Sequence, residues 1–132
     1  IDRLKAAGHT VEGIDFSLSD YILPTYYILA TAEASSNLSR YDGVRYGYRS
    51  PNAVDLQSMY KKTRAEGFGK EVKRRIMLGS FVLSAGYYDA YFTKAQQVRR
   101  KLQLLTSTVF SSYDAIISPT VPAPAYRIGE LQ

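Results

Sequence analysis

With 132 residues, of which 45% are hydrophobic and 22% are charged, the chain is long enough to form a globular core. It has no cysteine, which excludes a disulfide framework and a thiolate metal site, and its single histidine, His9, cannot by itself form a catalytic triad or a metal site. The net charge of +5 permits contact with tRNA or another polyanion.

Periodicity and turn residues predict about four main helices and two short strands. We expect the helices at residues 20–38, 52–64, 71–84 and 88–111, after the last turns of a shorter helix at 2–7. The strands are expected at residues 11–16 and 114–119, followed by a loop that contains Pro119, Pro122 and Pro124.

The helix at residues 88–111 is the longest expected element. Apolar side chains recur along it at steps of three and four, at Tyr91, Ala95, Val98, Leu102, Leu105 and Val109. This spacing predicts an amphipathic helix with one face packed on a core. The opposite face carries the basic run 99–101, which is either a solvated surface or a patch that binds phosphate.

The two expected strands are too few for a sheet. A continuous apolar strand such as residues 114–119 needs neighbours on both sides, and the sequence offers no partners for it. The chain also begins at Ile1 and stops just after its proline-rich loop. We therefore expect residues 1–132 to be a helix-rich α/β piece of a larger domain, incomplete at both ends.

Two runs carry the most chemical information: the small-residue helix at 20–38 and the KRR run at 73–75. The KRR run directly precedes the apolar segment 76–83, so we expect the second half of its helix to be buried and its arginines to be partly desolvated. Such an arginine requires a carboxylate. The carboxylate belongs either to a small molecule or to a structural ion pair with Glu33, Glu71 or Asp89.

Most hydrolase motifs are absent. The chain has no Gly-rich phosphate loop, no GxSxG elbow and no HExxH sequence. Ser35 and Ser36, on the small-residue helix, indicate close packing with another element rather than a nucleophile. No apolar run approaches the roughly 18–20 residues of a membrane span and no secretory signal is visible, so we expect a cytoplasmic protein without membrane contact.

Three runs carry a family resemblance: EASSNLSRYDGVRYGYR at 33–49, GFGKEVKRRIMLG at 67–79 and SAGYYDAYFTKAQQVR at 84–99. Over roughly residues 1–131 the chain resembles the glutaminase subunits (GatA) of glutamyl-tRNA(Gln) amidotransferases, within the amidase signature family. The resemblance implies a three-layer α/β/α fold with a mixed sheet. Segments outside this chain would complete that sheet.

The resemblance also implies a function. Subunits of this kind hydrolyse glutamine, and the ammonia is used to convert Glu-tRNA(Gln) to Gln-tRNA(Gln), so the whole complex is a carbon–nitrogen ligase with glutamine as amide donor. Subunits B and C would be the protein partners, and tRNA would be reached indirectly through the complex. ATP and Mg²⁺ would be used by the partner subunit, and this chain would bind no cofactor and no metal.

For the site, the resemblance implies part of a glutamine pocket and no catalytic residue. The family's lysine, cis-serine and nucleophilic serine belong to a stretch that this chain lacks, so the isolated chain is expected to be inactive. The residues that hold glutamine match Tyr26 and Arg75, with Arg75 on the α-carboxylate; Tyr27 and Arg74 are the neighbouring alternatives. Gly79, one turn after Arg75, is expected to clear space above its guanidinium. The family's acidic residue for the amino group of glutamine falls after residue 132.

Two other functions remain open at this point. One is a different amidase-family hydrolase. The other is a basic helical module that binds tRNA or protein through residues 99–101 and the tyrosines. Within the amidotransferase interpretation, the tyrosine-rich loop at 41–48 is a candidate rim for the passage of ammonia to the partner subunit.

Overall fold

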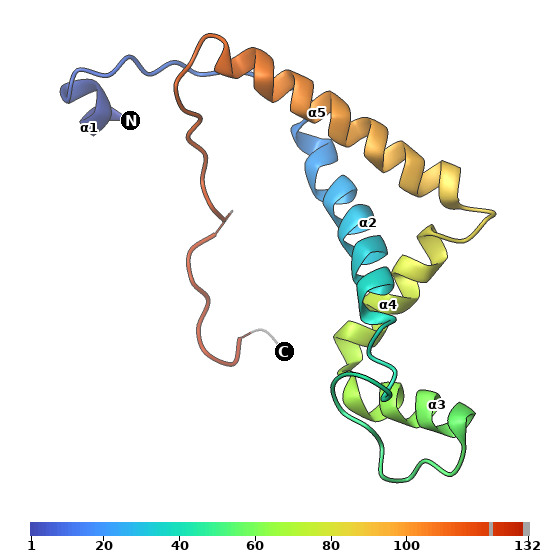
Figure 1. The fold of residues 1–132 in the computed structure, drawn as a ribbon. Helices are drawn as coiled ribbons and strands as arrows, with labels where there is room; N and C mark the ends of the chain where they lie inside the picture. Colours follow the sequence, from blue (N-terminus) through green and yellow to red (C-terminus); the bar gives the residue numbers. More distant parts are fainter. Residues whose placement is uncertain (122, 131–132) are drawn as a thin grey trace.

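The structure, a computed structural model, describes residues 1–121 and 123–130. Its elements in chain order are α1 (Asp2–Ala6), α2 (Ser19–Leu38), α3 (Leu56–Gly67), α4 (Lys70–Val82), the π-helix η1 (Asp89–Thr93) and α5 (Lys94–Phe110). Figure 1 shows α2 in the middle of the molecule, with α5 packed near its N-terminal end and α4 crossing it near its C-terminal end. The lobe formed by α3 and the loop before it lies beyond this crossing.

The crossing of α2 and α4 is the closest helix contact, and it depends on Gly79. A Cβ atom at this buried residue would overlap the carbonyl oxygen of Thr31 and lie 2.5 Å from the Cβ of Ser35. The hydroxyls of Ser35 and Ser80 hydrogen-bond across the crossing at 3.0 Å. The buried Thr31 hydroxyl donates to the carbonyl oxygen of Tyr27 at 2.7 Å. Close packing at Ser35, expected from the sequence, is confirmed.

The lobe is held together by backbone groups of the loop that bind side chains of α3. The backbone N–H of Ser50 donates to the hydroxyl of Thr63 at 3.1 Å, and both residues are buried. The Arg64 guanidinium donates to the carbonyl oxygens of Leu38 at 2.8 Å and Tyr41 at 3.2 Å. Because the first acceptor lies at the C-terminal end of α2, Arg64 also satisfies an orphan carbonyl there.

The helices leave much of their apolar surface uncovered. The accessible surface is 10816 Å², whereas a compact monomer of this mass would expose about 7,000 Å². The fully buried hydrophobic residues of the described chain are Ala32, Met59, Val82 and Ala95. The expected burial of the second half of the KRR helix is wrong, because Met77 there is 74% exposed and only Gly79 and Val82 of α4 are buried.

The four main helices form where the sequence predicts them, with ends that differ by up to a few residues. The helix expected at 88–111 begins as the π-helix η1 and continues as α5. Its apolar face is confirmed from Ala95 onward, where Ala95 is buried and Val98, Leu102, Leu105 and Val109 are half-buried, whereas Tyr91 at its start is exposed. None of the helices in residues 1–121 and 123–130 is both long enough and apolar enough to cross a membrane.

The two predicted strands are not confirmed. Residues 11–16 and 114–119 run as irregular backbone, and no strand forms anywhere in the part of the chain that the structure describes. The physical reason is that a strand needs the backbone of a neighbour to complete its hydrogen bonds, and none lies beside either segment. The two regions are joined instead by one side-chain contact, from the hydroxyl of Tyr113 to the carboxylate of Glu12 at 2.6 Å. Pro122 of the expected proline loop lies outside the described residues.

The crossing generates a stability prediction. Gly79→Ala places a methyl group against the backbone of α2, so α4 must move away, and we expect the free energy of unfolding to fall by roughly 1–3 kcal/mol or more. Thermal and urea unfolding followed by circular dichroism measure this loss.

Gly86→Ala is the matched control, because nothing lies within 4 Å of a Cβ atom at Gly86 and its φ is not positive. This control should change the stability by less than about 1 kcal/mol in either direction. Equal stability of the two variants would contradict the close-packing role of Gly79.

Candidate functional site

The groove beside the α2–α4 crossing brings the sequence-predicted site residues together. It has a volume of ≈ 280 Å³ and is lined by Tyr27, Thr31, Arg74, Arg75 and Leu78. Tyr26 lies next to this lining on α2, with its ring centroid 5.5 Å from that of Tyr27. Two helices that are far apart in the sequence therefore supply the tyrosines and the arginines, as expected for the two sides of one site.

Glu71 joins the two arginines. Both of its carboxylate oxygens accept from Arg74, from Nε and Nη2 at 2.8 Å each, and one of them also accepts from the Nε of Arg75 at 2.9 Å. These partners lie three and four residues after Glu71 on α4, the spacing at which helix side chains meet. Of the ion pairs expected for Arg75, the structure therefore selects the one with Glu71.

The electrostatics follow from this arrangement. Hydrogen bonds from Arg74 and then Arg75 lower the pKa of Glu71 to about 2. The pKa of Arg75 is raised, chiefly by its hydrogen bond to Glu71 and further by the neighbouring Tyr26. The pKa of Arg74 is raised by Glu71 and, more weakly, by Tyr27. Each tyrosine thus lies near its own arginine.

The two arginines differ in what they can still bind. Arg74 meets both oxygens of Glu71 through two of its nitrogens and is 67% exposed. Arg75 uses only Nε and is 40% exposed. Among the described residues, no group accepts a hydrogen bond from its two terminal nitrogens. A planar guanidinium with two free terminal nitrogens can bind a carboxylate in a bidentate manner, which favours Arg75 over Arg74.

The space at Gly79 does not serve the Arg75 guanidinium. The sequence predicts that Gly79 clears space above the Arg75 guanidinium, but the space at Gly79 is filled by the backbone of α2 at Thr31. Glu71 is the more informative residue, because its spacing to both arginines is visible in the sequence. The glycine instead allows α4 to approach α2 closely enough for the arginines to lie beside the tyrosines.

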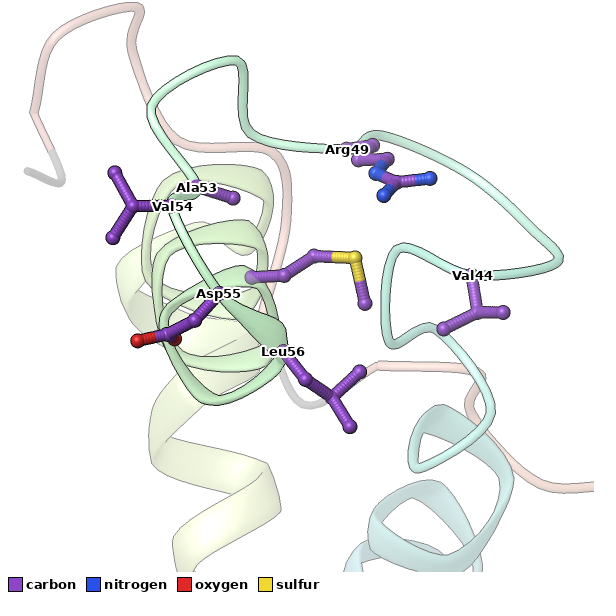
Figure 2. A pocket seen from close by; sticks show the side chains of 7 residues that line it. Val44, Arg49, Ala53, Val54, Asp55 and Leu56 are labelled. Carbon is purple, nitrogen blue, oxygen red and sulfur yellow. The ribbon is translucent and has the colours of Figure 1, made fainter.

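A second pocket, of ≈ 380 Å³, lies in the lobe between the loop and the start of α3 (Figure 2). Val44 and Arg49 lie on its loop side, and residues 53–56 lie on the side of α3. Its lining is mostly apolar, with Arg49 and Asp55 as the charged groups. The Asp55 carboxylate is already engaged, since it accepts from the backbone N–H of Ser58 at 2.6 Å and caps α3. Arg49 is therefore the charged group available to a ligand there.

Comparison with known proteins places the chain in a family. The sequence model of the Amidase family matches residues 1–132, the whole chain. The chain belongs to the amidase family. The amidase resemblance carried by the EASSNLSRYDGVRYGYR and GFGKEVKRRIMLG runs is therefore confirmed.

Several curated proteins named as the A subunits of glutamyl-tRNA(Gln) amidotransferases are similar to the chain. The protein of Geobacillus sp. (strain WCH70) is 61% identical over 127 residues, which are 96% of this chain and 26% of that protein. The protein of Acidobacterium capsulatum is 58% identical over 130 residues, which are 98% of this chain and 27% of that protein. The chain thus spans about a quarter of the length of the curated relatives that it matches.

The low pKa of Glu71 predicts that the stability of the fold decreases at acidic pH. Because this pKa is lowered in the folded state from an ordinary value of 4.5 to about 2, the ion pairs stabilise the fold fully above about pH 4.5. Their contribution is lost as the pH falls towards 2. We expect NMR titration of the Glu71 side-chain carboxyl carbon to give a midpoint near 2.

The double variant Arg74→Gln/Arg75→Gln is the control for this titration. It removes both donors without removing the carboxylate, so the midpoint of Glu71 should return towards 4.5. A midpoint that stays low in this variant would show that something other than the two arginines holds the carboxylate ionised.

Proposed function

We propose that this chain supplies part of the glutamine pocket of an amidotransferase glutaminase subunit, with Arg75 as the group that binds the α-carboxylate and Tyr26 beside it. The observation that carries this proposal is the Arg75 guanidinium. It is anchored through Nε by Glu71 at 2.9 Å, and both terminal nitrogens are free of acceptors among the described residues. Glutamine offers the planar carboxylate that this group can bind.

The proposal extends to the whole protein. The parent subunit hydrolyses glutamine, and the ammonia serves the conversion of Glu-tRNA(Gln) to Gln-tRNA(Gln) in a complex with subunits B and C, in the cytoplasm. ATP and Mg²⁺ are used by the partner subunit. Relatives that carry the amidotransferase name over 96% of this chain support this extension.

We also propose that residues 1–132 are one piece of an amidase domain rather than a complete one. The uncovered apolar surface supports this, as do the two unpaired segments at 11–16 and 114–119. Ile117 in the second segment is 69% exposed, and a sheet would give it cover. Further strands of the same three-layer α/β/α domain would give both segments the neighbours that a sheet requires.

The test of the pocket is Arg75→Ala in the full-length subunit within its complex. Loss of a charge-assisted bidentate contact should raise the KM for glutamine on the order of thirty-fold to several-hundred-fold. Initial rates of ammonia release against glutamine concentration measure it. The kcat should change much less, because the contact is made in the ground state as well as in the transition state.

Arg74→Ala is the matched control, because this arginine belongs to the same groove and the same ion-pair cluster. Its KM should stay within several-fold of the unmodified enzyme. An unchanged KM in Arg75→Ala would overturn the assignment. If Arg74→Ala raised the KM more than Arg75→Ala does, the carboxylate-binding role would belong to the neighbouring pair, Arg74 and Tyr27.

The isolated chain gives a simpler prediction. Because a serine nucleophile needs a base within hydrogen-bond reach and the chain lacks the family's catalytic stretch, purified residues 1–132 should release no ammonia from glutamine above the buffer background. A coupled glutamate dehydrogenase assay measures this. Turnover by the isolated chain would mean that a nucleophile lies within these residues after all.

A further inference from the structure

The positive charge of the chain is concentrated in one region, residues 40–75, which comprise the lobe and the first turns of α4. This region holds ten lysines and arginines against four acidic residues, a net charge of +6. The rest of the chain holds seven against eight, a net charge of −1. The excess of +5 therefore comes from about a quarter of the sequence, which indicates a localised field rather than a generally basic surface.

The four acidic side chains of this region are all engaged within the chain. Asp42 accepts from the backbone N–H of Val44 at 2.8 Å, and Asp55 caps α3. Glu66 accepts from the hydroxyl of Tyr48 at 2.7 Å, and Glu71 binds the two arginines of the groove. Apart from Glu71, none of them forms an ion pair among the described residues.

Four basic side chains of the same region are exposed and uncommitted: Arg45, Arg49, Lys61 and Lys70. Among the described residues they make no side-chain hydrogen bond and no ion pair, in contrast to Lys62 and Lys73, which donate to backbone carbonyls. Because these four side chains form no such contacts among the described residues, none has to be broken when they bind an anion. The lobe can therefore bind a ligand that carries several negative charges.

Aromatic rings lie among these cations. Tyr41 and Tyr46 form an edge-to-face pair with centroids 6.2 Å apart, and they are 41% and 52% exposed. Arg45 is adjacent to Tyr46 in sequence, and Arg49 borders the apolar pocket shown in Figure 2. Exposed tyrosines beside free arginines are the surface on which unpaired bases stack while their phosphates are neutralised.

We propose that the loop–α3 lobe binds single-stranded RNA, with phosphates on Arg45, Arg49, Lys61 and Lys70 and a base stacked on Tyr46. The choice of RNA rests on the tRNA-linked function proposed above. The surface itself does not depend on the glutamine site. An acidic protein would satisfy the charges but would leave the paired tyrosines unused, so the rings favour nucleic acid.

The test measures binding of the full-length subunit that contains these residues to a fluorescently labelled single-stranded RNA oligonucleotide by anisotropy, at several salt concentrations. Four phosphate contacts predict that log Kd rises with log salt with a slope of about 2.8. The variant with glutamine at positions 45, 49, 61 and 70 should lose most of this slope. The control variant removes the same number of charges from α5, with glutamine in place of Lys94, Arg99, Arg100 and Lys101, and should bind like the unmodified chain.

Two further arms complete the test. Tyr46→Leu should raise the Kd roughly five- to hundred-fold while leaving the salt slope unchanged, since it removes stacking and no charge. Four single glutamine variants should each lower the slope by about 0.7, which gives the same answer independently if the quadruple variant unfolds.

The proposal would be overturned if the lobe variant and the α5 variant lost equal amounts of RNA affinity. It would also be overturned if the lobe variants bound RNA like the unmodified chain. The base-stacking part would be overturned if polyphosphate displaced the labelled RNA as strongly as unlabelled RNA does and if Tyr46→Leu left the Kd unchanged. Tighter binding of the DNA oligonucleotide of the same sequence would overturn the choice of RNA. No arm of the experiment contains glutamine, so its failure is distinguishable from failure of the carboxylate site.

Discussion

The close approach of α2 to α4 is the contact on which the rest of the structure depends. At Gly79 the two helices meet without a side chain between them, and a hydrogen bond joins the hydroxyls of Ser35 and Ser80 across the contact. The arginines lie one turn before this point on α4, and the tyrosines lie about one turn before Thr31 on α2. The glycine therefore positions the candidate site although it is not among the residues that line the groove.

The same helix α4 serves two chemical environments. Towards α2 its first turns present arginines organised by Glu71, with a bidentate pair at Arg74 and a single bond at Arg75. Towards the lobe, Lys73 donates to the carbonyl oxygen of Ala65 at the end of α3. The groove and the basic lobe therefore share the short helix α4.

Much of this site can be inferred from the sequence. The family resemblance identifies the tyrosines and arginines, and the structure brings them together across the α2–α4 crossing. The spacing of Glu71, three and four residues before the two arginines, is a signal that the sequence contains, whereas only the tertiary structure shows that Glu33 and Asp89 form no ion pair with Arg75 among the described residues. The role of Gly79 also differs from the one the sequence predicts, since a missing side chain does not reveal which neighbour fills the space.

The sequence by itself determined the helices, because helix propensity, the Asp55 cap of α3 and the apolar periodicity of α5 are local properties, and it determined the family through three specific runs. The tertiary structure decided which face of each helix is covered. In α4 it leaves more apolar side chains exposed than the apolar run 76–83 predicts. It also decided that residues 11–16 and 114–119 form no sheet within the described chain, because strand pairing depends on neighbours that local sequence does not contain. Which cations remain free is likewise a tertiary property, since it depends on which carboxylates and carbonyl groups fold against them.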